Sequence, residues 1–190
     1  MKLKFPSIQT LWRDLTKVAL RFPIQLVLII ICTVAWCYVT NQKYNAPFQP
    51  EAIRLIFAGN LAFALMIAID LFAEANFINM MRKWTLRAIG LMIGIGLFFW
   101  LKPGFYLADN IRIAILAFAL HLLVAFAPFI GKDNLTGFWE YNKTLFVRFL
   151  SAGLYAAVLF LGLAAALAAI DSLFNVKVDW SIYMQLFAIV

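Results

Sequence analysis

Charged side chains are scarce in this sequence. Only 13% of its 190 residues are Asp, Glu, Lys or Arg, whereas 65% are hydrophobic. A soluble domain of ordinary composition is roughly 25% charged, because it must cover its surface with polar groups. The composition therefore excludes an ordinary soluble fold and indicates that lipid surrounds much of the chain.

Cysteine and histidine are nearly absent, which limits the chemistry available to the chain. Cys32 and Cys37 form no CxxC pattern and lie in one apolar run, where we interpret both as small buried hydrophobes. His121 is the single histidine, so no cluster with metal-ligand spacing exists. No nucleophile-elbow, phosphate-loop, zinc-protease or dinucleotide-binding motif appears. We therefore expect no metal site and no cofactor, and we favour a protein without enzymatic activity.

Hydrophobic runs of spanning length dominate what is present, and they predict an all-α, polytopic transmembrane helix bundle. Residues 1–21 read as a basic amphipathic helix lying at the membrane interface. The transmembrane domain is expected over residues 22–190. About five full spans are expected at 22–40, 52–73, 84–101, 111–130 and 145–170, followed by a partial sixth at 180–190. That last run is too short to cross a hydrocarbon core of ~30 Å, so we expect the natural chain to continue beyond Val190.

The distribution of Lys and Arg predicts a cytoplasmic N-terminus. With that orientation, eleven of the sixteen basic residues fall in inner segments and five in outer ones. Cytoplasmic segments of membrane proteins carry such an excess. The net charge of +7 is thereby explained by topology, and no clustered basic face indicates nucleic-acid binding.

The stretch from Gly131 to Lys143 is the least generic in the chain. It reads as an inner loop that combines turn residues with an aromatic and acidic cluster. Gly131 to Asn142, the later Ala169 to Phe174 and the early Trp12-Arg13-Asp14 together resemble the bacterial membrane family known as domain of unknown function 4153. The resemblance implies a multi-spanning protein of the bacterial inner membrane. It implies no activity, substrate or catalytic residue.

Three polar side chains within or near the spans form a candidate intramembrane site. Asn60, Asp70 and His121 stand out because polar groups inside spans are costly and often functional. Each also has a structural reading: Asn60 and His121 can bond neighbouring helices, and Asp70 can pair with Arg82 or Lys83 near the inner surface.

These features support three hypotheses about function. The first is a transporter or permease-like module that uses the candidate intramembrane site. The second is a membrane anchor, sensor or assembly module whose partner docks at Trp139, Glu140 and Tyr141. The third is an enzyme that pairs His121 with a carboxylate. Membrane lipids are the expected surroundings, and the sequence leaves substrate and oligomeric state open.

Overall fold

Every regular element is helical in the part of the chain that the computed structural model describes, which comprises residues 8–42, 47–102 and 107–190. The all-α prediction is confirmed, and five helices are long and apolar enough to cross a membrane. In chain order the elements are α1 (Ile8–Arg21), α2 (Pro23–Asn41), α3 (Gln49–Ala75), α4 (Met80–Trp100), α5 (Leu107–Phe126), the 3₁₀ turn η1 (Ala127–Phe129), α6 (Leu135–Phe174) and α7 (Trp180–Ile189).

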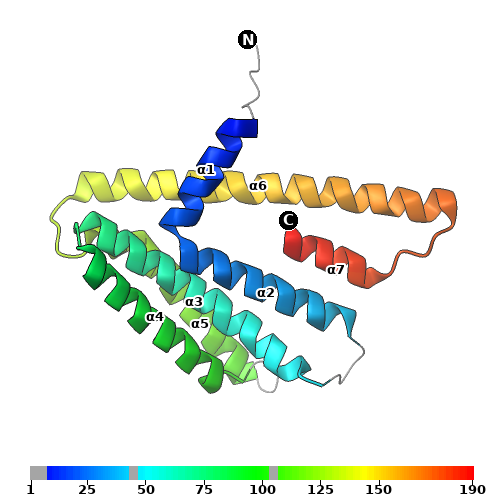
Figure 1. The fold of residues 1–190 in the computed structure, drawn as a ribbon, viewed down its shortest axis with the longest axis horizontal. Coiled ribbons are helices and arrows are strands. Elements are labelled where there is room, and N and C mark those ends of the chain that lie inside the picture. The colour runs from blue at the N-terminus through cyan, green and yellow to red at the C-terminus, as the bar shows by residue number, and fades with distance from the viewer. Residues whose placement is uncertain (1–7, 43–46, 103–106) are drawn as a thin grey trace, which may run out of the picture.

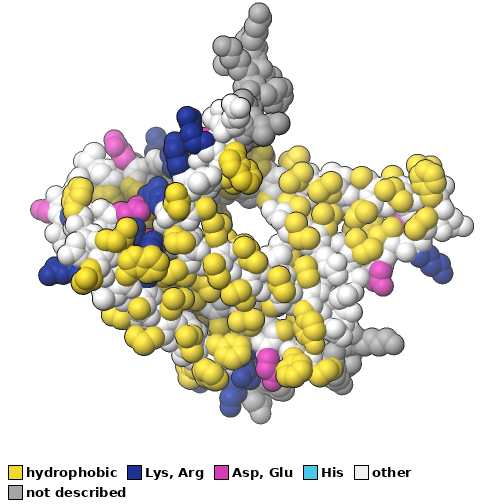
Figure 2. All heavy atoms as spheres, in the orientation of Figure 1, with side chains coloured by type: hydrophobic (Ala, Val, Ile, Leu, Met, Phe, Trp, Pro, Cys, Tyr) yellow, Lys and Arg dark blue, Asp and Glu magenta, His cyan; other side chains and the backbone are white. Residues whose placement is uncertain are grey.

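Helix α3 is the centre of the bundle. It packs against α2, α4 and α5, and it also contacts η1 (Figure 1). Met66 and Asp70 of α3 are both fully buried. The other long helices bury little of their own surface. On the face shown in Figure 2, hydrophobic side chains cover the middle of the bundle, and most charged ones lie toward its ends.

Two glycines allow α4 to lie close to α3. A methyl group added at Gly94 would come within 2.9 Å of the Ala62 side chain, and one added at Gly90 within 2.8 Å of the Met66 sulfur. Small residues at such positions let helix backbones approach in lipid, as the spacing of these two glycines predicts. Gly96 faces open space instead.

Helix α6 is longer than the sequence pattern predicts. It begins ten residues before the expected span of 145–170 and ends four residues after it. Forty residues at the rise of an α-helix extend about 60 Å, twice the ~30 Å of a hydrocarbon core. No residue of α6 is buried, and Figure 1 shows it running apart from the α2–α5 bundle over most of its length.

The expected loop from Gly131 to Lys143 is mostly helix, so that prediction was wrong for Leu135 onward. The Asn134 side chain accepts a hydrogen bond from the Gly137 backbone at 2.8 Å and caps the start of α6. Asn is a preferred capping residue, and the turn signal had obscured this role.

Helices α1 and α7 flank the bundle. Helix α1 projects from the start of α2 (Figure 1), with Trp12 and Leu15 exposed. The basic residues Lys2 and Lys4, assigned to this amphipathic segment, lie outside the described residues. Helix α7 returns to pack on α2, where the Trp36 indole donates to the Met184 carbonyl at 2.9 Å.

Candidate functional site

Asp70 lies at the centre of a buried charge network. Arg87 donates to both of its carboxylate oxygens, from Nε at 2.8 Å and from Nη2 at 2.9 Å. Gln25 of α2 donates to the same carboxylate at 2.8 Å. An unpaired charge in this environment would be costly, and a two-bond guanidinium contact is the strongest available compensation. The pairing therefore joins α2, α3 and α4 at one point.

Further charged side chains extend the network toward the surface. Arg21 binds Glu74 at 2.6 Å, and Lys83 lies between the two acids, 3.3 Å from Glu74 and 3.8 Å from Asp70. The hydrogen bond to Glu74 raises the pKa of Arg21 above its ordinary value. The backbone carbonyl of Arg21 also accepts from Arg87 at 3.1 Å. The C-terminal end of α1 is thereby fastened to the C-terminal part of α3 and to the first turns of α4.

The network gives Asp70 and Glu74 of α3 a structural role, because each is paired with basic side chains. The predicted ion pair between Asp70 and Lys83 is present, but Arg87 is the principal partner. The Arg87 side chain is only 4% exposed and stacks on the Trp84 ring at 4.9 Å. An aromatic face adds to the stabilisation of a guanidinium.

A separate cavity of about 950 Å³ lies between α3, α5 and α6. It extends on α3 from Phe57 to Leu71, which is about 21 Å at the rise of a helix. Its polar lining comprises Asn60, His121, Asn142 and Asn110, and the remaining lining residues are apolar. Binding sites for small molecules have this size and this balance of apolar walls and few polar groups.

Three polar groups of the cavity are fixed by bonds to backbone carbonyls. The Asn60 amide nitrogen donates to Ile56 at 2.8 Å. The Asn142 amide nitrogen donates to Ala125 at 3.2 Å and to Phe138 at 2.9 Å. His121 Nδ1 lies 2.7 Å from the Ala117 carbonyl. These bonds settle which atom of each group is left for an occupant.

The structure brings two of the three candidate intramembrane residues together. Asn60 and His121 line the same cavity, whereas Asp70 is not among its lining residues and is fully buried. No Asp or Glu is among the described lining residues, so the cavity offers His121 no carboxylate partner. Among the described residues, no three His, Cys, Asp or Glu side chains are grouped closely enough to hold a metal ion.

The side chains of the aromatic and acidic cluster at the start of α6 do not all point the same way. Tyr141 packs on Phe129 at a ring distance of 5.6 Å and donates to the Val124 carbonyl at 3.2 Å. Trp139 is 70% exposed, and Glu140 is also exposed. Tyr141 therefore holds α6 to α5, while Trp139 and Glu140 face outward.

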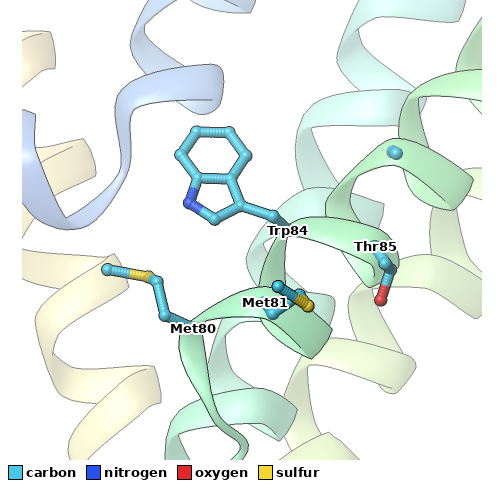
Figure 3. Close-up of a pocket in the computed structure, with 5 residues that line it drawn as sticks. Met80, Met81, Trp84 and Thr85 are labelled. Atoms are coloured by element: carbon cyan, nitrogen blue, oxygen red, sulfur yellow. The ribbon is translucent and has the colours of Figure 1, made fainter.

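A shallow apolar hollow lies on the first turns of α4. Figure 3 shows Met80 and Trp84 extending to one side of the helix and Thr85 to the other. The hollow holds no charged side chain. Trp84 and the two methionines fit the interfacial depth of a membrane, where amphipathic aromatic rings gather.

Sequence reasoning missed the parts that Gln25 and Asn142 play. Gln25 sits three residues into its helix and resembles an ordinary polar flank, and Asn142 was placed in a loop. Their polar character within apolar surroundings was the available signal, but only the packing of α2 and α6 gives it meaning.

No family model, curated protein or solved structure matches this chain. The resemblance to the domain of unknown function 4153 therefore stays a prediction. The five apolar helices are those of a multi-pass membrane protein.

Proposed function

We propose that this chain is a transporter-like membrane module whose substrate site is the cavity between α3, α5 and α6. The observation that carries the proposal is that Asn60 of α3 and His121 of α5 line the same cavity of about 950 Å³. Polar groups inside spans commonly line a pathway. Asp70 is excluded from that role because Arg87 and Gln25 occupy its carboxylate.

Helix α6 forms one wall of the cavity, and its few attachments would allow it to move. Near its start α6 is held by Tyr141 and Asn142, whose side chains bond the last carbonyls of α5. Beyond its midpoint, α6 meets α7 through Phe160 and Phe187, with ring centroids 5.6 Å apart. A helix with no buried residue can shift while few packed contacts are lost, which would open or close the cavity.

Cysteine accessibility tests the pathway. In a Cys32→Ala, Cys37→Ala background, single cysteines at Ala114 and Ala117 report on the cavity lining, and Ile95→Cys on α4 is the lipid-facing control. We expect a membrane-impermeant maleimide to label both lining positions several-fold faster than position 95. Equal, slow labelling at all three positions would refute a water-accessible pathway.

Orientation and location complete the proposal. We propose a cytoplasmic N-terminus, because this orientation places eleven of the sixteen basic residues in inner segments, and cytoplasmic segments carry such an excess of Lys and Arg. The family resemblance supports the bacterial inner membrane. Fusions after Lys102 and after Gly131 test the topology. An alkaline phosphatase reporter should be active only after Lys102, and the reverse pattern would invert the orientation.

A second candidate is an assembly module that binds a protein partner at Trp139 and Glu140. The exposure of Trp139 at the start of a helix that has no buried residue favours it. Co-purification from membranes with Trp139→Ala and Glu140→Ala should then lose a defined partner, with Tyr155→Ala on the same helix as control. Identical partners in all variants would exclude this docking surface.

A further inference from the structure

We infer that the α3–α5–α6 cavity selects a long apolar molecule bearing an uncharged hydrogen-bond donor, such as a long-chain alcohol, over a carboxylate of the same length. The inference deepens the proposed function by naming its substrate class. It concerns binding alone, so it can be tested apart from transport.

The length and lining of the cavity set the apolar part of the occupant. Side chains of Phe57, Phe63, Ile67, Phe146 and Phe149 are among the walls. The distance of about 21 Å along α3 covers about two-thirds of a hydrocarbon core of ~30 Å. A flexible chain fits such a site, because burying apolar surface supplies most of the affinity.

The polar side chains of the cavity determine which hydrogen-bonding group the bound molecule should carry. Because a carbonyl oxygen only accepts, the group facing it in Asn60 and Asn142 must be the amide nitrogen, which leaves each amide oxygen as an acceptor. By the same reasoning His121 Nδ1 carries the hydrogen, and Nε2 of the neutral ring is an acceptor. Three of the four polar side chains of the cavity, on three different helices, therefore present acceptor atoms, and a donor is their complement.

The described lining residues carry no Asp, Glu, Lys or Arg, which favours an uncharged molecule. Among the described lining residues there is no Lys or Arg to neutralise a carboxylate, and no Asp or Glu to neutralise an ammonium group. Burying an unpaired charge is far more costly than burying a hydroxyl that finds an acceptor. A hydroxyl is the group that meets both conditions.

Photo-crosslinking of the purified full chain in detergent tests the inference. The probes are diazirine-labelled hexadecanol and diazirine-labelled hexadecanoate, with unlabelled hexadecanol or its methyl ether as competitor. We expect labelling by the alcohol to exceed labelling by the carboxylate about tenfold or more, because the alcohol gains one or two hydrogen bonds and the carboxylate would be buried without a counter-charge. Labelled peptides should come from residues 57–71, 110–124 and 142–149. The methyl ether, which lacks the donor, should compete more weakly than hexadecanol.

Matched variants locate the preference. Asn60→Leu and His121→Phe should each lower labelling by the alcohol several-fold and leave labelling by the carboxylate unchanged. Asn76→Leu is the control, because Asn76 also donates to a carbonyl of its own helix but does not line the cavity. A variant that elutes as aggregate is discarded, since the alcohol-to-carboxylate ratio of the unmodified chain already decides the question.

The outcomes separate this inference from the proposed function. Equal labelling by the two probes, preference for the carboxylate, or labelling confined to other helices would overturn it. Alcohol preference together with unreactive cysteines at Ala114 and Ala117 would refute a water-accessible pathway and leave the binding site standing.

Discussion

Replacing Asp70 by Asn should strongly destabilise the bundle, even though the side chain keeps its size. The carboxylate is completely buried and accepts three hydrogen bonds, two from Arg87 and one from Gln25. An Asn side chain at this position can accept through one oxygen only, and its NH₂ group then faces other donors. The Arg87 guanidinium, only 4% exposed, is left without its principal counter-charge.

The expected loss follows from the cost of breaking a buried pair. Removing one partner of such a pair costs about 3–5 kcal/mol. For a chain of this size that corresponds to a lower unfolding temperature by roughly 6–20 °C. The assay is the fraction of protein that remains monodisperse in detergent after heating, measured by fluorescence-detected gel filtration.

A double-mutant cycle identifies the mechanism. In Asp70→Asn with Arg87→Met the unpaired charge is gone, and the new amide can accept from Gln25. The double variant should therefore be more stable than Asp70→Asn alone, with a coupling energy of about 1–3 kcal/mol. If the loss of stability in the double variant equalled the sum of the losses in the two single variants, the reasoning would be refuted.

An exposed pair provides the control for that cycle. Asp109 and Arg112 lie 3.0 Å apart on α5, with the Arg112 side chain 63% exposed. Pairs in this setting contribute about 0–1 kcal/mol. Asp109→Asn should therefore shift the unfolding temperature by no more than a few degrees, and a shift as large as that of Asp70→Asn would show that burial is not the cause.

Three further changes test the helix packing and the contribution of Arg21. Gly94→Leu should separate α4 from α3 and lower thermal stability by several degrees, whereas Gly96→Leu, which meets open space, should change it little; equal losses would exclude close packing as the cause. Trp36→Phe removes the hydrogen bond to α7 and should increase protease cleavage just before α7 without changing the rest of the digestion pattern. Because the pKa of Arg21 is raised in the folded state, its contribution is complete below its ordinary pKa and is lost only as pH rises through the raised value. Arg21→Gln should therefore lower stability by the same small amount at pH 7 and pH 9 in thermal scans, and a loss that shrinks at pH 9 would contradict the shift.

The parts of the fold that composition and hydropathy could predict are those that depend on the solvent around the chain. Long apolar runs bounded by polar breaks fix where helices lie, and the sequence placed five of them correctly as elements. It placed the start of α6 incorrectly because Asn134 and Gly137 read as turn residues, while in the structure one caps the helix and the other donates to it. A capping signal and a turn signal use the same residue types.

The candidate site was predicted in part, because its residues were chosen by polarity and depth rather than by direction. Consecutive residues of an α-helix point about 100° apart, so the ten steps from Asn60 to Asp70 leave their side chains in directions about 80° apart. Asn60, Ala64 and Leu71 share the face that lines the cavity, and Asp70 faces the α2–α4 side instead. Because the cavity extends along α3 as far as Leu71, the direction of the Asp70 side chain, rather than its depth, keeps it out of the lining. What no single sequence gives is which neighbour each face meets, since Arg87 and His121 are placed beside α3 only by the packing of α4 and α5. Helix α3 thus carries the buried Asp70 pair on one face and an open cavity on another, so stability and binding can be altered separately. Asp70→Asn should lower the unfolding temperature without changing which probe the folded protein binds. Asn60→Leu should change the probe preference without changing the unfolding temperature.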